Sequence, residues 1–411
     1  MAGVTTSSVR RSPWRTVTLS TVSACVIVAA AWYFAAAGAQ PGEAAAPLGA
    51  TTFVPAFATE VVERLPPASI ASKRDLRVRA ESAARKDQSV AVAVTMARRH
   101  LERARREGEP REAGLARSAL GDWWDSPDAP VPVLLVRAAI RQHGHDFTGA
   151  LADLERAITA DSRNVQAWLS RAAIQQTVGE LQAAADSCRR VVALSNHIAG
   201  HVCLADLASL HGDQEALDRI GRRLEGTQVG AAAAGWVLTV QAEMAERLGR
   251  NAAAEELFRA AAGRAAGSYA RVAYADFLLA NDRAREVDAL LAAAPATDAV
   301  LLRRAIALHG VEDARADAVA DELRQRFTSP AGEDGPMHLR EMARFFLEVE
   351  GDARTAVDLA RRNWSLQKEP ADAWLLAAAA QAAGDPDAAI PVRDFVRNHG
   401  LFDVRLHELL R

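Results

Sequence analysis

The chain has 411 residues, 50% of them hydrophobic and 25% charged, a composition typical of a globular protein with an extensive core. Aromatic residues make up only 5%, so alanine, leucine and valine must supply much of the apolar surface, which favours closely packed helices. The formal net charge of -3 gives no support for a nucleic-acid partner, and we expect none.

Residues 1–39 have the pattern of an export signal or an N-terminal membrane anchor. A flank with three arginines precedes the uncharged apolar residues 16–38. As a helix this run would reach about 34 Å, enough to span a bilayer, while the small residues at 37–39 offer a cleavage site. Both alternatives place the remaining chain in the periplasm. It is either soluble there after signal cleavage or held at the inner membrane by residues 16–38.

Three further segments follow the N-terminal one. Residues 40–72 are rich in Ala, Pro and Gly at first and then contain three more prolines, so we expect a linker and an extended segment. Residues 73–400 have a helical pattern, with Gly and Pro mainly between periodic stretches. Residues 401–411 are expected to form a C-terminal capping helix, because a stacked array must cover its last apolar face.

A period of 34 residues organises the helical segment. His145 is 34 residues before Gly179, and Ala150 is 34 before Ala184. Between Ala167 and Leu194, one apolar helical face precedes Gly179 and a second face follows it, which predicts a helix-turn-helix unit. One such unit cannot bury its apolar face alone, so we expect neighbouring units to stack. The predicted units begin near Asp87, Val131, Val165, Ala199, Gly235, Gly267, Asp298, Met337 and Ala371.

Several features interrupt the pattern. Trp123 and Trp124 precede a loop rich in Pro and Asp, and they either anchor a partner or pack over the N-terminal unit. The segment Thr328–Pro336 is predicted to be a loop. Cys188 and Cys203 lie on consecutive predicted helices, so they form either a disulfide in an oxidising compartment or two buried thiols.

A cluster of metal-binding residue types lies at one predicted turn. His143, His145 and Asp146 offer two imidazoles and a carboxylate, a set that can bind zinc or copper. In the alternative interpretation they form an exposed turn, with Asp146 starting the next helix. We expect the turn, and no metal.

The repeating unit resembles the tetratricopeptide repeat family. Its matching residues in one unit are Trp168, Ala172, Gly179 and Ala184, and other units match at different positions. Arg171, Gln175, Cys188, Val191 and Asn196 depart from the family pattern. The resemblance covers about residues 87–400. It implies an all-α fold, a right-handed α-solenoid superhelix of stacked helix-turn-helix units.

In this family the first helix of each unit lines a concave face that often holds an extended peptide. The resemblance therefore implies a binding surface that is apolar in its first half and more charged further along. For the apolar members, packing against the next unit is an equal alternative. The implied partner-binding residues are Leu135, Ala139, Gln142, Leu169, Ala173, Gln176, Thr177, Glu243, Glu246, Arg271 and Phe345.

The sequence holds no phosphate-binding glycine loop, nucleophile elbow, haem-attachment motif or HExxH motif. We therefore expect no enzyme and no cofactor, but a scaffold of the bacterial cell envelope that binds a protein or peptide partner. Two alternatives stay open. One is a metal-handling accessory protein that uses His143, His145 and Asp146. The other is a helical enzyme in which carboxylates such as Glu243 and Glu246 act as acid and base.

Overall fold

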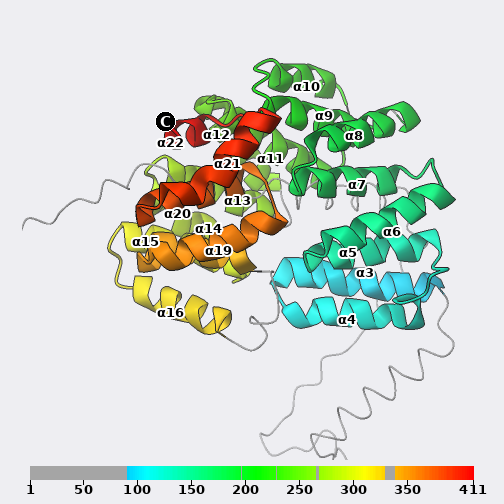
Figure 1. Cartoon of the computed structure of the whole chain (residues 1–411), viewed down its shortest axis with the longest axis horizontal. Coiled ribbons are helices and arrows are strands. Elements are labelled where there is room, and N and C mark those ends of the chain that lie inside the picture. The colour runs from blue at the N-terminus through cyan, green and yellow to red at the C-terminus, as the bar shows by residue number, and fades with distance from the viewer. Residues whose placement is uncertain (1–89, 196, 228, 265–267, 329–337) are drawn as a thin grey trace, which may run out of the picture.

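A computed structural model describes residues 90–195, 197–227, 229–264, 268–328 and 338–411 of the chain (Figure 1). The predicted signal or anchor, the linker and nearly all of the predicted loop at 328–336 lie outside these ranges. Within them every regular element is helical, and none of these helices is both long and apolar enough to cross a membrane.

The helices pack as sequential pairs, which confirms the predicted all-α fold. The pairs are α3 (Val90–Glu107) with α4 (Pro110–Leu120), α5 (Val131–His143) with α6 (Phe147–Ala160), α7 (Val165–Thr177) with α8 (Leu181–Ser195), α9 (Ile198–Leu210) with α10 (Ala216–Leu224), α11 (Ala231–Arg247) with α12 (Asn251–Arg264), α13 (Tyr269–Ala280) with α14 (Ala284–Leu291), α15 (Asp298–Gly310) with α16 (Ala316–Phe327), α18 (Leu339–Phe345) with α19 (Ala353–Leu366), and α20 (Pro370–Ala383) with α21 (Ile390–His399).

Short elements complete the chain. A 3-10 turn, η1 (Gly121–Trp123), follows α4, a π-helical turn, η3 (Phe346–Glu350), extends α18, and a second 3-10 turn, η4 (Pro386–Ala389), leads into α21. The last helix, α22 (Val404–Leu409), packs against α20. The first helices of successive pairs also contact one another, as α11 does with α9 and α13.

One left-handed residue marks the turn inside each pair. These residues have φ between 57° and 85° and lie 30 to 39 residues apart. Most are glycine, because a residue without a Cβ adopts positive φ readily. The predicted turn at Gly179 is among them, so the 34-residue spacing does correspond to a structural repeat. The nine positions are Gly108, His145, Gly179, Gly212, Gly249, Asp282, Glu312, Gly351 and Gly384.

Small residues let the two helices of a unit approach closely. Ala172 on α7 and Ala184 on α8 are both 0% exposed, as is Cys188 one turn further along α8. Leu169 is also buried, while Trp168 is half-buried and donates its indole N–H to the carbonyl of Ser162 at 3.0 Å. Alanine pairs therefore set the spacing within units, and larger apolar side chains fill the space between units.

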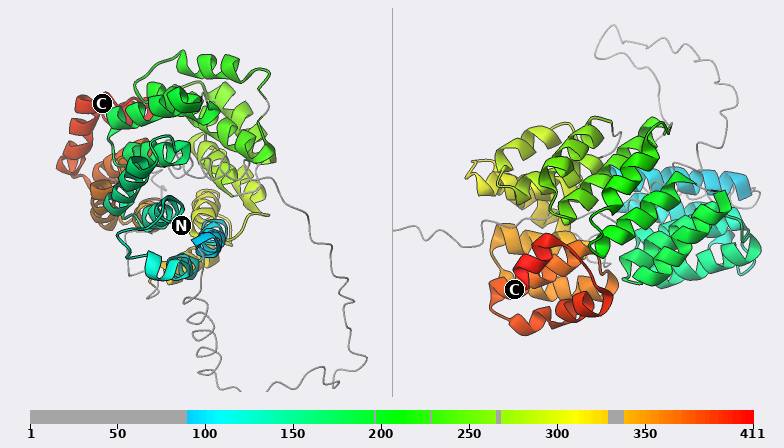
Figure 2. Two further views of the ribbon diagram at one scale, coloured as in Figure 1. Left: turned by 90° about the vertical axis from the view of Figure 1, so that its right-hand side faces the viewer. Right: turned by 90° about the horizontal axis from the view of Figure 1, so that it is seen from above.

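The helical pairs follow a curved course that brings the last pairs back to the earlier ones (Figure 2). Two backbone hydrogen bonds join these distant parts of the chain. The amide of Lys368 donates to the carbonyl of Thr177 at 2.8 Å, and the amide of Phe402 donates to the carbonyl of Leu210 at 2.7 Å. The stack is therefore closed by long-range contacts. The right-handed twist of the superhelix stays a prediction.

Candidate functional site

Most of the predicted partner-binding residues occupy equivalent positions on the first helices of several units. Gln142, Gln176 and Glu246 each lie three residues before the left-handed residue of their unit, and Ala139, Ala173, Glu243 and Phe345 lie six residues before it. Two of the set, Leu135 and Arg271, keep partial exposure. The others are buried by the chain itself: Ala139, Gln142, Leu169, Ala173, Gln176, Thr177, Glu243, Glu246 and Phe345.

The apolar members of this set belong to the hydrophobic core. Leu169 and Ala173 lie in one cluster with the helices of the following units. Phe345 packs edge-on against Phe327 with 5.7 Å between ring centroids. For these residues the structure shows the packing alternative, and their role in partner binding stays a prediction.

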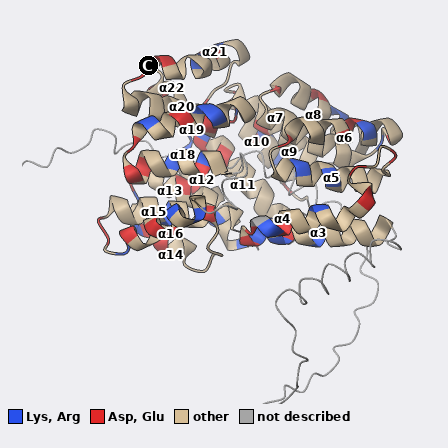
Figure 3. Cartoon of the chain, turned by 60° about the horizontal axis from the view of Figure 1, so that its bottom comes forward, with Lys and Arg blue, Asp and Glu red and all other residues tan. Residues whose placement is uncertain are grey.

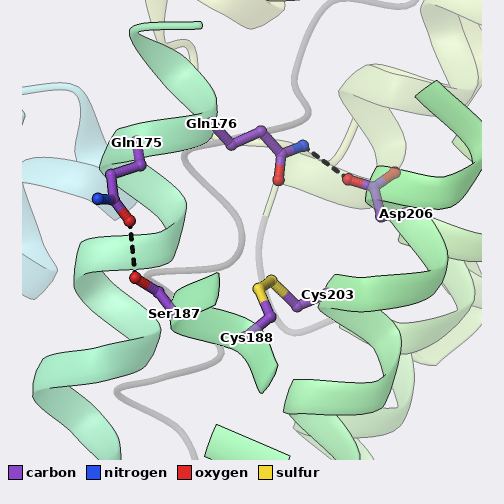
Figure 4. The surroundings of a disulfide bond; sticks show 6 residues. All are labelled: Gln175, Gln176, Ser187, Cys188, Cys203 and Asp206. Atoms are coloured by element: carbon purple, nitrogen blue, oxygen red, sulfur yellow. Dashed lines mark hydrogen bonds between the residues drawn. A yellow bond between two sulfur atoms is a disulfide. The ribbon is translucent and has the colours of Figure 1, made fainter. Parts of the chain in front are cut away.

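Two polar members, Gln176 and Glu243, take part in hydrogen bonds between first helices. Gln176 on α7 donates from Nε2 to Asp206 on α9 at 2.7 Å (Figure 4). The guanidinium of Arg247 on α11 contacts the same carboxylate at 3.0 Å and also donates to the hydroxyl of Ser209. Asp206 and Arg247 are 1% and 2% exposed. One buried carboxylate therefore links three consecutive units.

A second buried carboxylate, that of Asp276, links three units further along the chain. Asp276 on α13 accepts from Arg303 on α15 at 2.8 Å and from Arg344 on α18 at 2.9 Å. Although burial alone would raise the pKa of Asp276, the two guanidinium groups lower it below its ordinary value. Arg344 also pairs with Glu348 at 2.6 Å. The carboxylate of Asp276 is therefore ionised inside the fold, and the positive charges of the guanidinium groups balance its negative charge.

Two further sets of polar contacts join first helices of neighbouring units. Arg340 on α18 contacts Asp372 at 2.7 Å and Glu369 at 2.6 Å, both at the start of α20. Glu243 on α11 accepts from the phenol of Tyr269 on α13. We call the whole set the inner polar network; its members are Gln176, Asp206, Arg247, Glu243, Tyr269, Asp276, Arg303, Arg344, Arg340, Glu369 and Asp372.

The inner polar network links the first helices of neighbouring units. Buried ion pairs of this kind contribute little net stability but strongly penalise loss of one partner. Glu243 and Glu246, the carboxylates of the enzyme alternative, are held by Tyr269 and by Arg405, the latter at 2.6 Å. Elsewhere basic and acidic residues are spread over many of the helices (Figure 3).

The cluster of His143, His145 and Asp146 lies at the turn between α5 and α6. The carboxylate of Asp146 accepts from the amide of Gly149 at 2.9 Å and caps α6, as the turn interpretation predicts. Burial lowers the pKa of His143 to about 3 and that of His145 to about 4, so both rings are neutral. Within the described ranges, no three His, Cys, Asp or Glu side chains are placed so that they could hold a metal ion together.

The paired tryptophans pack over the N-terminal units. Trp123 and Trp124 are half-buried against the cluster formed by α3 to α6. The ring of Trp124 lies beneath the guanidinium groups of Arg117 and Arg141, at 4.8 and 5.5 Å from its centroid. The structure therefore shows the packing alternative, and a role of the two tryptophans in partner binding stays a prediction.

Cys188 and Cys203 form a disulfide between α8 and α9 (Figure 4). Their Cα atoms are 6.0 Å apart, within the ordinary range for a bridge, and both residues are 0% exposed. The sequence left a disulfide and two thiols open, and the structure has the disulfide. It ties the second helix of one unit to the first helix of the next.

Sequence reasoning missed the central members of the inner polar network. Asp206, Asp276, Arg303 and Arg344 stand among apolar residues of their helices, at positions where a surface residue is not expected. A charge on the apolar face of a helix is a usable signal, because buried charges need partners. The partner itself is not local: Asp276 and Arg344 are 68 residues apart.

Comparisons with known proteins add little to this description. No protein-family profile matches the chain, and no curated protein sequence does so either. Among solved structures, it is similar to a tetratricopeptide repeat protein from Parabacteroides merdae, with a TM-score of 0.31 and 14% identity over 70% of this chain and 99% of that one. The helical pairs themselves therefore define the class, an all-α helical-repeat protein.

Proposed function

We propose that this protein is a non-catalytic scaffold of the bacterial cell envelope that binds a segment of a partner protein. The observation that carries the proposal is the succession of nine helical pairs within the described residues, each marked by one left-handed turn residue. Such stacks present an extended, regularly spaced surface, and that surface suits protein segments rather than small molecules.

Two observations support a location outside the cytoplasm. The first is the basic flank and apolar run of residues 16–38. The second is the buried disulfide between Cys188 and Cys203, because disulfides persist in oxidising compartments. Sequencing the mature N-terminus distinguishes the two forms of export: a start at Gln40 indicates a cleaved signal, and an intact N-terminus indicates an anchor.

Partner capture should use photocrosslinking, because the chain has only three lysines, Lys73, Lys86 and Lys368. A photoreactive amino acid placed at Leu135 or Arg271 probes the half-buried members of the predicted binding set. The same group at Arg189, on the exposed side of α8, is the control. We expect one recurring protein neighbour in intact cells from the first two positions and not from the third. The absence of any neighbour from all three positions contradicts the scaffold proposal.

A further inference from the structure

The C-terminal segment lies across the turns of three earlier units. Each of these turns holds a left-handed glycine, Gly179, Gly212 or Gly249, where a side chain is absent. A Cβ built on Gly179 would come within 2.8 Å of the ring of Phe395, and one on Gly212 within 3.1 Å of the ring of Phe402. One on Gly249 would lie 3.4 Å from Val404. Three apolar side chains of the C-terminal segment, Phe395, Phe402 and Val404, therefore pack over three turn glycines that belong to successive units.

Polar contacts accompany the apolar ones. The amide of Phe402 donates to the carbonyl of Leu210, in the manner of a captured extended peptide. Arg405 pairs with Glu246 on α11 at 2.6 Å, as well as with Asp403. Glu246 is buried, so it needs a cation at this point, and Arg405 meets that need.

We propose that the turns at Gly179, Gly212 and Gly249 form a docking edge, now occupied by the chain's own segment Phe395–Arg405. The edge fits a partner segment that presents aromatic or branched apolar side chains to the glycines and an arginine to Glu246. The segment competes from within the same molecule, at an effective concentration in the millimolar range, so a partner must displace it. This inference rests on the proposed scaffold function and gives it a place on the molecule.

A fluorescent peptide with the sequence of residues 394–411 tests the edge on the full-length protein. The variant Arg405→Glu places an acidic group beside Glu246 and should release the tethered segment. We expect the peptide to bind this variant at least about tenfold more tightly than it binds the wild-type chain, as fluorescence anisotropy would show. Arg397→Glu is the matched control, because Arg397 is exposed and pairs with Asp394 on the same helix, α21. It should bind the peptide as the wild type does.

Other outcomes overturn the inference. Equal peptide affinity for the wild type and for a folded Arg405→Glu variant excludes a displaceable segment. If that variant loses its helical circular dichroism, Phe402→Ala replaces it, and loss of folding in both shows a structural cap instead of a docking edge. A variant that forms a dimer unable to bind the peptide shows that the edge accepts a second copy of the chain. The peptide result is independent of photocrosslinking in cells, so this inference and the scaffold proposal can fail separately.

Discussion

At the scale of single residues, the left-handed turn positions favour glycine for a reason separate from packing. Gly249 has φ 77°, and a Cβ there meets Val404 only at an ordinary contact distance. Gly249→Ala should therefore lower the free energy of unfolding by about 1–2 kcal/mol through backbone strain. Gly114, inside α4 with nothing within 4 Å of a built Cβ, is the control. Gly114→Ala should raise the free energy of unfolding by up to about 1 kcal/mol. Urea denaturation measures the free energy of unfolding of both variants. A change of the same sign in the two variants would contradict the expected strain at Gly249.

Asp276 shows how much depends on one buried carboxylate. Asp276→Asn keeps the shape but removes the carboxylate that Arg303 and Arg344 share, although Arg344 retains Glu348. We therefore expect a loss of about 3–5 kcal/mol at neutral pH. Asp218→Asn is the control, because Asp218 forms an exposed pair with Arg250. It should cost less than about 1 kcal/mol. Denaturant unfolding at neutral pH provides the comparison.

The same carboxylate predicts a pH dependence. The folded-state pKa of Asp276 is below its ordinary value, so its stabilising effect is complete above the unfolded pKa of about 4 and is lost as the pH falls toward the folded pKa. The wild type should therefore lose stability more steeply than Asp276→Asn as the pH falls below about 4. Parallel stability curves for the two proteins over this range would show that Asp276 does not carry the effect.

At the scale of elements, the disulfide should stabilise the junction between α8 and α9. It closes a sequence separation of 15 residues, for which chain entropy predicts about 3 kcal/mol. Reduction should lower the free energy of unfolding by about that amount. The double variant with Cys188→Ala and Cys203→Ala should start lower and be insensitive to reductant. A wild type equally stable with and without reductant would falsify this estimate.

The elements themselves were predictable from the sequence because their signals are local. Units predicted to start at Val131, Val165 and Asp298 correspond to helices that begin at those residues. Amphipathic spacing and turn glycines fix such boundaries within a few residues of the chain. The site was less predictable. Several predicted positions recur at the same distance from the left-handed turn residue of their unit. Whether a side chain such as Gln176 or Phe345 faces a partner or the next unit depends on how tightly the units stack, and the sequence of one unit does not encode that packing.

At the scale of the whole molecule, the return of the C-terminal units changes how the stack should open. In an open solenoid each repeat contacts only its neighbours, so the end repeats fray first. Here Lys368 and Phe395 contact the turn at Thr177 and Gly179, several units earlier in the chain. We therefore expect α20 and α21 to share protection from hydrogen exchange with the turn between α7 and α8, although they stand near the end of the array.

Gly179→Ala tests this coupling, with Gly249→Ala as the matched control. Both glycines have positive φ, 85° and 77°, so both substitutions strain the backbone. Only at Gly179 does the added Cβ collide with the C-terminal units, at 2.8 Å from Phe395 and 3.1 Å from Lys368. Hydrogen exchange measured by mass spectrometry should show faster exchange in α20 and α21 for Gly179→Ala than for Gly249→Ala, with α14 to α16 unchanged in both. Faster exchange confined to α7 and α8 would mean that the two halves of the chain open independently.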